Sequence, residues 1–401
     1  MVIKIIKTLL FVLIIILLTN KIFPQNKFQN LTLKNGLSSN KVYSCLKDSK
    51  GFVWFTTDNG LCRYDGIRFK IFNMDDKNQP ELKENIFDYI FQRTEDELLF
   101  ISSGGKLYSY SYGKGKFINL SEKIHSLKNK FLTNLYKDRN NFYWFSTETG
   151  LLKTDGQFNL IGEYKIEENK ADRRVSNRVM KICEDKTGIF WLGMFSRAVM
   201  RFDPKTGRFS SGELSNVLPP HLQVKSILTF LKSDFVFIAT GGEGLLKINI
   251  HNFSCEKWKY VTGSSNSLPS DRITVLCSQN DSILWVGTLE GLSQLNLKSK
   301  KITNYYHDPQ NPYSLVNNYI TNLYIGPQNI LWVSTFGGIS ELYTNSDRFI
   351  KVSQSSQSKN TISSNIVNHC IRDKFGNLWL ATSKGIDVKD ANGSRYYHYN
   401  L

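Results

Sequence analysis

The sequence predicts an all-β fold built from one unit that is repeated along the chain. The stretch DSKGFVWFTTDNGLCRYDG starts at Asp48, and near-copies start at Asp138, Gln279, Gly326 and Asp373. Within each copy, apolar and polar residues alternate with a period of two, which is typical of strands. Eight copies follow one another at intervals of 44 to 48 residues, and their central aromatic residues, which we expect to form the repeat core, are Trp54, Phe100, Trp144, Trp191, Phe237, Trp285, Trp332 and Trp379.

Each copy has room for four short strands joined by tight turns. In the first copy Asp48 and Gly51 mark the turn after the first strand, and Gly60 marks the turn after the second. Asp can bind nearby backbone N–H groups, and Gly adopts the positive φ that such turns need. Four antiparallel strands in a repeat of this length indicate a β-propeller blade, with the aromatic residue between neighbouring blades. The strands expected in the first copy are residues 41–47, 52–57, 61–65 and 69–73.

The number of blades depends on which copy accepts the strand expected near the N-terminus, residues 28–33. If the Trp332 copy accepts it, residues 26–345 form a seven-bladed propeller and 346–401 the first, incomplete blade of a second one. If the Trp379 copy accepts it, eight blades close the ring and the strand at 395–401 is redundant. This redundancy favours seven blades, and it implies that the chain is a fragment of a longer protein.

The N-terminus carries an export signal. Lys4 and Lys7 precede an apolar run that is too short for an ordinary membrane span, so residues 1–25 are expected to be a signal peptide or a retained anchor. We therefore expect the remainder in the periplasm.

Charge and cysteine usage set further bounds. Lys and Arg outnumber Asp and Glu by 51 to 35 but are scattered, so we expect no contact with nucleic acid and, if any polyanion, an acidic polysaccharide. Cys45, Cys183, Cys277 and Cys370 lie in apolar strand runs and are expected to be buried thiols. The sequence predicts no metal site and no cofactor.

The first copy, GLSSNKVYSCLKDSKGFVWFTTDNGLCRYDGIRFKIFN, resembles the two-component regulator propeller repeat. Proteins of this family are periplasmic sensor regions of hybrid two-component system histidine kinases of the Bacteroidetes type. The resemblance implies two seven-bladed propellers ahead of a membrane helix and a kinase, a dimeric receptor associated with the inner membrane, and often a glycan ligand. The sequence shows no kinase element, so the resemblance supports the sensor part alone.

The resemblance and the loop pattern together predict a ligand-sensing module that recognises a glycan and is not an enzyme. The alternatives are a docking platform for protein partners and, less favoured, a propeller lyase or hydrolase. The loops between the second and third strands vary most while their frame is constant, so specificity should lie there. The candidate ligand-binding residues are Asp58, Asn59, Glu148, Arg197, Glu243, Glu290, Phe336 and Lys384.

Overall fold

The computed structural model describes residues 28–166, 176–195, 198–219, 222–230, 232–326, 328–344, 361–390 and 395–399. The expected signal peptide or anchor, residues 1–25, and the candidate residue Arg197 lie outside this set. The described strands form eight four-stranded antiparallel sheets, so the all-β propeller fold is confirmed. The chain divides into two compact units, residues 1–344 and 345–401, and each is described by itself.

Seven sheets, or blades, make up the first unit, and their strands are called a to d from the centre of the ring outwards. The strands of blades 1 to 4 are β2 (Val42–Lys47), β3 (Val53–Thr57), β4 (Gly60–Tyr64), β5 (Phe69–Phe72); β6 (Phe87–Thr94), β7 (Glu97–Ser102), β8 (Leu107–Ser111), β9 (Lys116–Asn119); β10 (Leu132–Lys137), β11 (Tyr143–Thr147), β12 (Gly150–Thr154), β13 (Leu160–Lys165); β14 (Val179–Glu184), β15 (Phe190–Met194), β16 (Val199–Asp203) and β17 (Arg208–Ser210). Those of blades 5 to 7 are β18 (Val224–Thr229), β19 (Phe235–Thr240), β20 (Leu245–Asn249), β21 (Cys255–Trp258); β22 (Ile273–Asn280), β23 (Ile283–Thr288), β24 (Leu292–Asn296), β25 (Ile302–Tyr305); β26 (Ile320–Ile325), β27 (Ile330–Thr335), β28 (Gly338–Tyr343) and β1 (Phe28–Leu31). Short helical turns lie in the connections at η1 (Leu33–Asn35), α2 (Leu120–Lys123), η2 (His125–Leu127) and α3 (Leu214–Val217).

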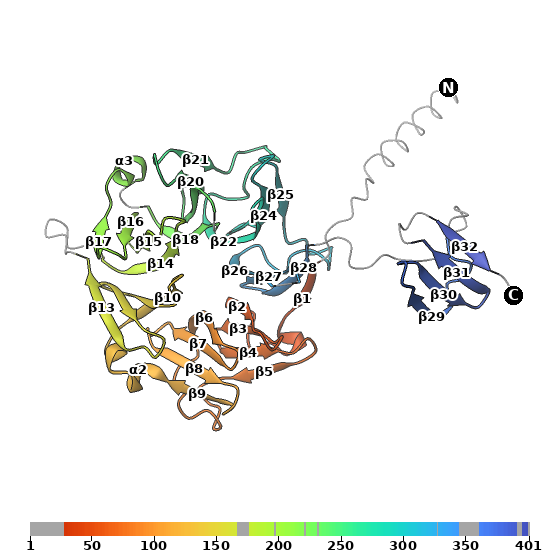
Figure 1. Ribbon diagram of the computed structural model, residues 1–401, viewed down its shortest axis with the longest axis horizontal. Helices are drawn as coiled ribbons and strands as arrows, with labels where there is room; N and C mark the ends of the chain where they lie inside the picture. The colour runs from red at the N-terminus through yellow and green to blue at the C-terminus, as the bar shows by residue number, and fades with distance from the viewer. Residues whose placement is uncertain are drawn as a thin grey trace. The chain divides into compact units, whose positions relative to one another are not determined.

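The ring closes because the first strand of the chain completes the last blade. β1 pairs antiparallel with β28, from Phe28 opposite Leu342 to Leu31 opposite Ile339. Figure 1 shows the innermost strands of the seven blades around one centre, and β2 contacts both β6 and β26. Eight blades would require β1 to pair with β31 (Gly385–Lys389), which pairs with β32 (Tyr396–Tyr399) instead. The seven-blade interpretation therefore describes this unit.

In five of the seven blades a tryptophan on strand b packs the blade against the next, and in four of these a side chain six residues earlier accepts a hydrogen bond from the indole. Trp54 is fully buried among residues of blade 2, and its Nε1 donates to Asp48 Oδ2 at 2.7 Å. Asp138 and Asp185 accept from Trp144 and Trp191 in the same way, each at 2.8 Å. The other oxygen of the carboxylate accepts from the backbone of the a–b turn, as Asp48 does from Phe52 N at 2.9 Å. A hydrogen bond to a charged group contributes about 1.5–3 kcal/mol, so the aspartate both shapes the turn and holds the indole.

Blade 7 lacks this acceptor. The residue six before Trp332 is Gly326, and among the described residues no group accepts a hydrogen bond from the buried Trp332 Nε1. The turn itself is unchanged, because Gly326 N donates to Ile330 O just as Asp48 N donates to Phe52 O. The deviation in blade 7 is therefore confined to one missing side chain.

The repeat position assigned to Phe100 is wrong by one residue. Trp54 pairs with Leu46 on strand a, and the pair at the same level of blade 2 is Leu99 with Phe91. Adjacent residues of a strand point to opposite faces. Phe100 therefore faces back to blade 1, with its ring centroid 5.6 Å from that of Trp54, while Leu99 packs against blade 3.

The second unit is a single sheet of β29 (Val367–Arg372), β30 (Leu378–Thr382), β31 and β32. Its Trp379 is 37% exposed, in contrast to the buried tryptophans of the ring, and Cys370 is exposed where a buried thiol was expected. Both differences have one cause: no second sheet of this unit lies among the described residues to cover the faces. The hydrogen bond between aspartate and indole is nevertheless present: Trp379 Nε1 donates to Asp373 Oδ2 at 2.9 Å. This bond is the main cause that lowers the pKa of Asp373 to about 2.

Cys45 and Cys183 in the ring are buried as expected, and burial raises the pKa of each thiol to about 12. Cys277 is only half-buried, with its pKa raised in the same way. None of the three is poised as a reactive thiolate.

We expect Gly326→Asp to stabilise the first unit by about 1–3 kcal/mol, because the new carboxylate would accept the hydrogen bond of Trp332 Nε1. A Cβ at Gly326 would meet nothing closer than 3.7 Å, so the backbone need not move. Urea unfolding of the 401-residue chain, followed by tryptophan fluorescence, measures the gain.

Gly326→Ala is the matched control, since it restricts the unfolded chain equally but carries no acceptor. If the Asp and Ala variants unfold at the same urea concentration, the carboxylate does not reach the indole and the explanation fails.

Candidate ligand-binding face

The b–c loops and the d–a connections lie on one face of the ring, and the a–b and c–d turns lie on the other, because each blade is a four-stranded meander. In five of the seven blades a threonine at the end of strand b fixes the b–c loop. Thr57 Oγ1 donates to Gly60 O at 2.9 Å and accepts from Asn59 N at 3.0 Å. The same threonine-to-glycine bond recurs from Thr147 to Gly150 and from Thr335 to Gly338. The two residues between are left to vary on a constant frame.

The glycine that ends this loop has a steric role. Gly150 has a φ of 148°, and a Cβ there would lie 2.1 Å from Tyr164 O on strand d of the same blade. Strand d can therefore reach its place in the sheet only because no side chain is present.

The polar residues at the entry to strand a close the d–a connections. Asn40 Oδ1 accepts from Leu33 N at 2.9 Å, and Asp271 Oδ1 accepts from Tyr260 N at 2.7 Å. Asn318 binds His307 N in the same way at 2.6 Å. These oxygens are already used inside the loops, so they shape the face rather than recognise a ligand.

Three of the acidic and amide candidates are held by neighbouring loops. Glu243 forms an ion pair with Lys259 at 2.9 Å, and Glu148 lies 3.6 Å from Arg178. The Asn59 side chain donates to Ser38 O at 3.3 Å.

The candidates do not gather at one point. Glu290 is exposed on the b–c loop of blade 6, at some distance along the ring from Asn59 and Glu148. Lys384 belongs to the second unit, and Arg197 lies outside the described residues. Six of the eight are therefore spread over the b–c loops of blades 1, 3, 5, 6 and 7.

Phe336 and Asp58 belong to a group that we call the aromatic–acid cluster: Tyr43, Asp58, Asp88, Tyr319 and Phe336. The Phe336 ring lies 4.2 Å from that of Tyr319 and 6.1 Å, edge on, from that of Tyr43, measured between centroids. Tyr319 is 37% exposed, so the cluster offers an aromatic surface to solvent. These residues come from blades 7, 1 and 2, which are consecutive in the ring.

Charge surrounds the aromatic rings of the cluster. Burial raises the pKa of Tyr43, and the charges of the Asp58 and Asp88 carboxylates raise it further. Asp58 is 3.8 Å from Lys41, and Asp88 accepts from Ser103 Oγ at 2.9 Å. Burial lowers the pKa of Lys181 on β14, an effect that Asp88 opposes. The cluster thus combines aromatic faces and carboxylates, with the Lys41 ammonium beside Asp58.

Sequence reasoning missed Tyr43, Asp88, Tyr319 and Lys181. Every innermost strand of the ring has a β-bulge after its first residue, and Tyr43 and Asp88 occupy the extra position in β2 and β6. A bulge re-aims the side chains around it, which brings these residues to the face. In the sequence, Tyr43 and Asp88 each come directly after the first apolar residue of strand a. The direction of each side chain depends on the bulge, which the sequence does not show.

A second aromatic group lies between blades 3 and 4. The Arg178 guanidinium is 4.3 Å from the centroid of Phe131 and 5.9 Å from that of Phe195, which is 57% exposed. Its Nε is buried and has no hydrogen-bond partner among the described residues.

The described residues contain no group of three or more His, Cys, Asp or Glu side chains that could hold a metal ion. No helix among them is both long and apolar enough to cross a membrane.

The fold and the loop face define a seven-bladed β-propeller with its variable residues on one side. The sequence profile of the family described as "Two component regulator propeller" matches residues 36–59 and 314–337, which span the b–c loops of blades 1 and 7. The chain therefore carries two-component regulator propeller repeats, and the resemblance seen in the sequence is confirmed. None of the curated proteins matches the chain significantly.

Solved structures share the fold at low identity. The extracellular domain of BT3049 from B. thetaiotaomicron, named as a hybrid two component system, is 22% identical with a TM-score of 0.63, and the match covers 94% of this chain and 49% of that one. The extracellular domain of BT4673 from the same organism is 21% identical with a TM-score of 0.62, and the match covers 94% and 53%. The chain thus spans about half the length of these domains.

An enzyme shares the fold as well. Virginiamycin B lyase from Staphylococcus aureus is 13% identical with a TM-score of 0.54, and the match covers 79% of this chain and 98% of that one. At such identity the likeness shows the fold alone.

We expect Gly150→Ala to destabilise the first unit by about 1–3 kcal/mol or more, because a Cβ would collide with Tyr164 O and the φ is unfavourable for an L-residue. Gly66→Ala is the control: its φ is 101°, but no atom lies within 4 Å of the added Cβ, so it reports strain without collision. Thermal unfolding of both variants should show the larger loss for Gly150→Ala, and equal losses would refute the steric role.

Proposed function

We propose that this chain is the ligand-sensing part of a two-component signalling receptor and that its first unit binds an oligosaccharide at the aromatic–acid cluster. The observation that carries the proposal is the cluster itself. The faces of Phe336 and Tyr319 suit the apolar face of a sugar ring, and the carboxylates of Asp58 and Asp88 can accept hydrogen bonds from its hydroxyl groups. A few convergent polar groups beside an aromatic wall are typical of small-molecule sites.

The rigid ring supports this role. Five b–c loops of the face are held by a threonine-to-glycine bond, as at Gly60, and entry residues such as Asn40 close d–a connections. Little conformational freedom is then lost on binding, which favours affinity.

The proposal includes the setting of the module. We propose that it acts in the periplasm, as part of a homodimeric receptor associated with the inner membrane, and that it binds its ligand without catalysing a reaction. Two findings support this setting: the two-component regulator propeller repeats, and the fold shared with extracellular domains named as two component systems.

The test is a screen of the 401-residue chain against glycan fragments by isothermal titration calorimetry. Phe336→Ala should weaken the binding of a fragment at least tenfold, about 1.4 kcal/mol, because it removes the central ring of the cluster. Asp58→Asn should weaken binding less, since the amide retains one acceptor oxygen.

Phe195→Ala is the matched control, because Phe195 is an exposed ring on the same face but outside the cluster. If Phe195→Ala abolishes binding and Phe336→Ala does not, the site lies beside Arg178 and the assignment to the cluster is wrong. If no glycan binds but a stable complex forms with an envelope protein, the chain is a docking platform. Turnover of a bound fragment would show an enzyme.

A further inference from the structure

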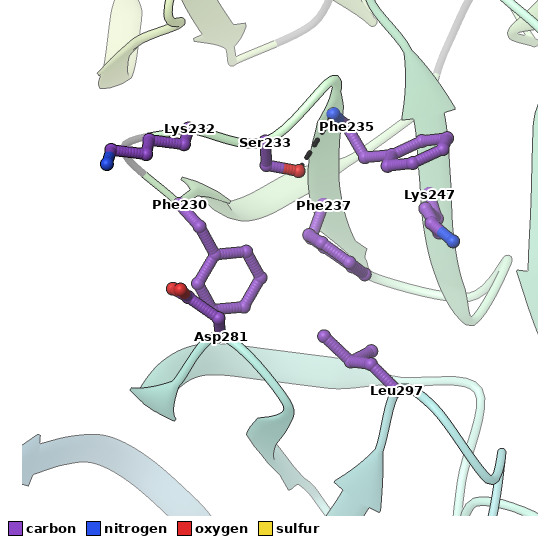
Figure 2. Close-up of a pocket in the computed structure, with 8 residues that line it drawn as sticks. All are labelled: Phe230, Lys232, Ser233, Phe235, Phe237, Lys247, Asp281 and Leu297. Atoms are coloured by element: carbon purple, nitrogen blue, oxygen red, sulfur yellow. Dashed lines mark hydrogen bonds between the residues drawn. The ribbon is translucent and has the colours of Figure 1, made fainter.

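A pocket of about 280 Å³ lies between blades 5 and 6. It is formed at the a–b turns of both blades and at the end of β24, so it lies on the face opposite the b–c loops and is separate from the aromatic–acid cluster. Figure 2 shows the eight residues that line it: Phe230, Lys232, Ser233, Phe235, Phe237, Lys247, Asp281 and Leu297.

The pocket lies where five of the other six blades place an indole ring. Phe237 pairs with Leu228 on strand a, as Trp54 pairs with Leu46, so it occupies the tryptophan position of blade 5. The facing blade also carries a smaller side chain here. Leu284 pairs with Leu295 in blade 6, and Leu98 pairs with Tyr110 at the same level of blade 2. Leu297 and Tyr112, each two residues further on, therefore occupy equivalent positions.

Between blades 1 and 2 the larger side chains fill this space. Trp54 Nε1 lies 3.1 Å from the Tyr112 hydroxyl, which in turn is hydrogen-bonded to Asp48. Replacing both rings by Phe237 and Leu297 removes an indole and a phenol from the interface between blades 5 and 6.

Blade 2 also lacks this tryptophan, and other side chains form its contact with blade 3. Between blades 2 and 3 the position is Leu99, and the Arg93 guanidinium lies 4.3 Å from the centroid of Phe158 while it forms an ion pair with Glu97 at 2.7 Å. The Arg93 guanidinium thus covers Phe158, which packs in the same core cluster as Leu99. Between blades 5 and 6 the corresponding space is open as the 280 Å³ pocket.

The lining selects a flat aromatic ligand. Phe230 and Phe237 meet edge to face, with centroids 5.6 Å apart, and Leu297 lies below Phe237 in the view of Figure 2. Lys247 is engaged already, since its ammonium is 4.0 Å from the centroid of Phe235 and 3.5 Å from a carboxylate oxygen of Glu256. Asp281, exposed beside Phe230, offers a carboxylate at the rim.

We propose that this pocket binds a small neutral aromatic heterocycle with a ring N–H, of which indole is the simplest member. The ring takes the place of the missing tryptophan side chain against Phe230, Phe237 and Leu297, and its N–H donates to Asp281. The pairing of an indole with a carboxylate repeats the arrangement of Trp54 with Asp48, with the ring supplied from solution. The volume is near the lower end of the range for ligand sites, which suits a ligand of this size.

Isothermal titration calorimetry of the 401-residue chain with indole tests the proposal, and benzofuran, which has the same shape but no N–H, serves as the comparison ligand. Indole should bind more tightly than benzofuran. Phe237→Trp should weaken indole binding at least tenfold without lowering the melting temperature, because the residue found at this position in the other blades fills the pocket. Asp281→Ala should remove the preference for indole over benzofuran.

Phe195→Trp, at an exposed phenylalanine on the opposite face, is the control and should leave indole binding unchanged. If Phe237→Trp lowers the melting temperature, Leu297→Phe fills the pocket from the other wall and takes its place in the test. Equal binding of indole to the wild-type chain and the filled variant, or no binding at millimolar indole, would overturn the proposal. Equal affinity for indole and benzofuran in the wild-type chain would overturn the role of Asp281.

Discussion

The contact between a buried indole and the next blade is the interaction on which the ring depends. A four-stranded sheet has two faces, and in five of the seven blades strand b carries a tryptophan on the face that meets the following blade. Burying a tryptophan removes about 150–250 Å² from water, worth at most about 4–6 kcal/mol, and the ring repeats this contact around its circumference. The buried Nε1 would offset part of that gain if it had no acceptor, so an aspartate at the turn completes the contact.

This contact also explains why the motif is spaced as it is. The aspartate must reach the backbone of its own turn with one oxygen and the indole with the other, and six residues from Asp48 to Trp54 satisfy both. Gln279 takes the same place before Trp285, at 3.0 Å, so an uncharged acceptor is tolerated. An acceptor of the right reach therefore serves whether or not it is charged, and blade 7 packs Trp332 without one.

Both proposed binding sites lie where the chain departs from the common pattern of the repeat. The aromatic–acid cluster uses positions that the frame leaves free, namely b–c loop residues and the bulges of β2 and β6. The pocket between blades 5 and 6 instead uses a position that the frame normally fills, because Phe237 is smaller than tryptophan. A repeat fold can thus gain a binding site by adding side chains to its loops or by removing one from its core.

The sequence by itself favoured seven blades over eight, and the pairing of β1 with β28 decided between them. It determined the repeat, the four strands of each blade and the burial of most core aromatics. These properties follow from local alternation and from a spacing that recurs many times. It misplaced Phe100, since one residue of slip reverses the face of a strand and the Phe and Leu of that strand are both apolar. It also named ligand residues in seven of the eight copies of the repeat. Only the tertiary structure decided that Phe336 meets Tyr43 and Tyr319, that Asp48 holds Trp54, and that the space beside Phe237 is open, because each depends on side chains that converge from different blades or turns.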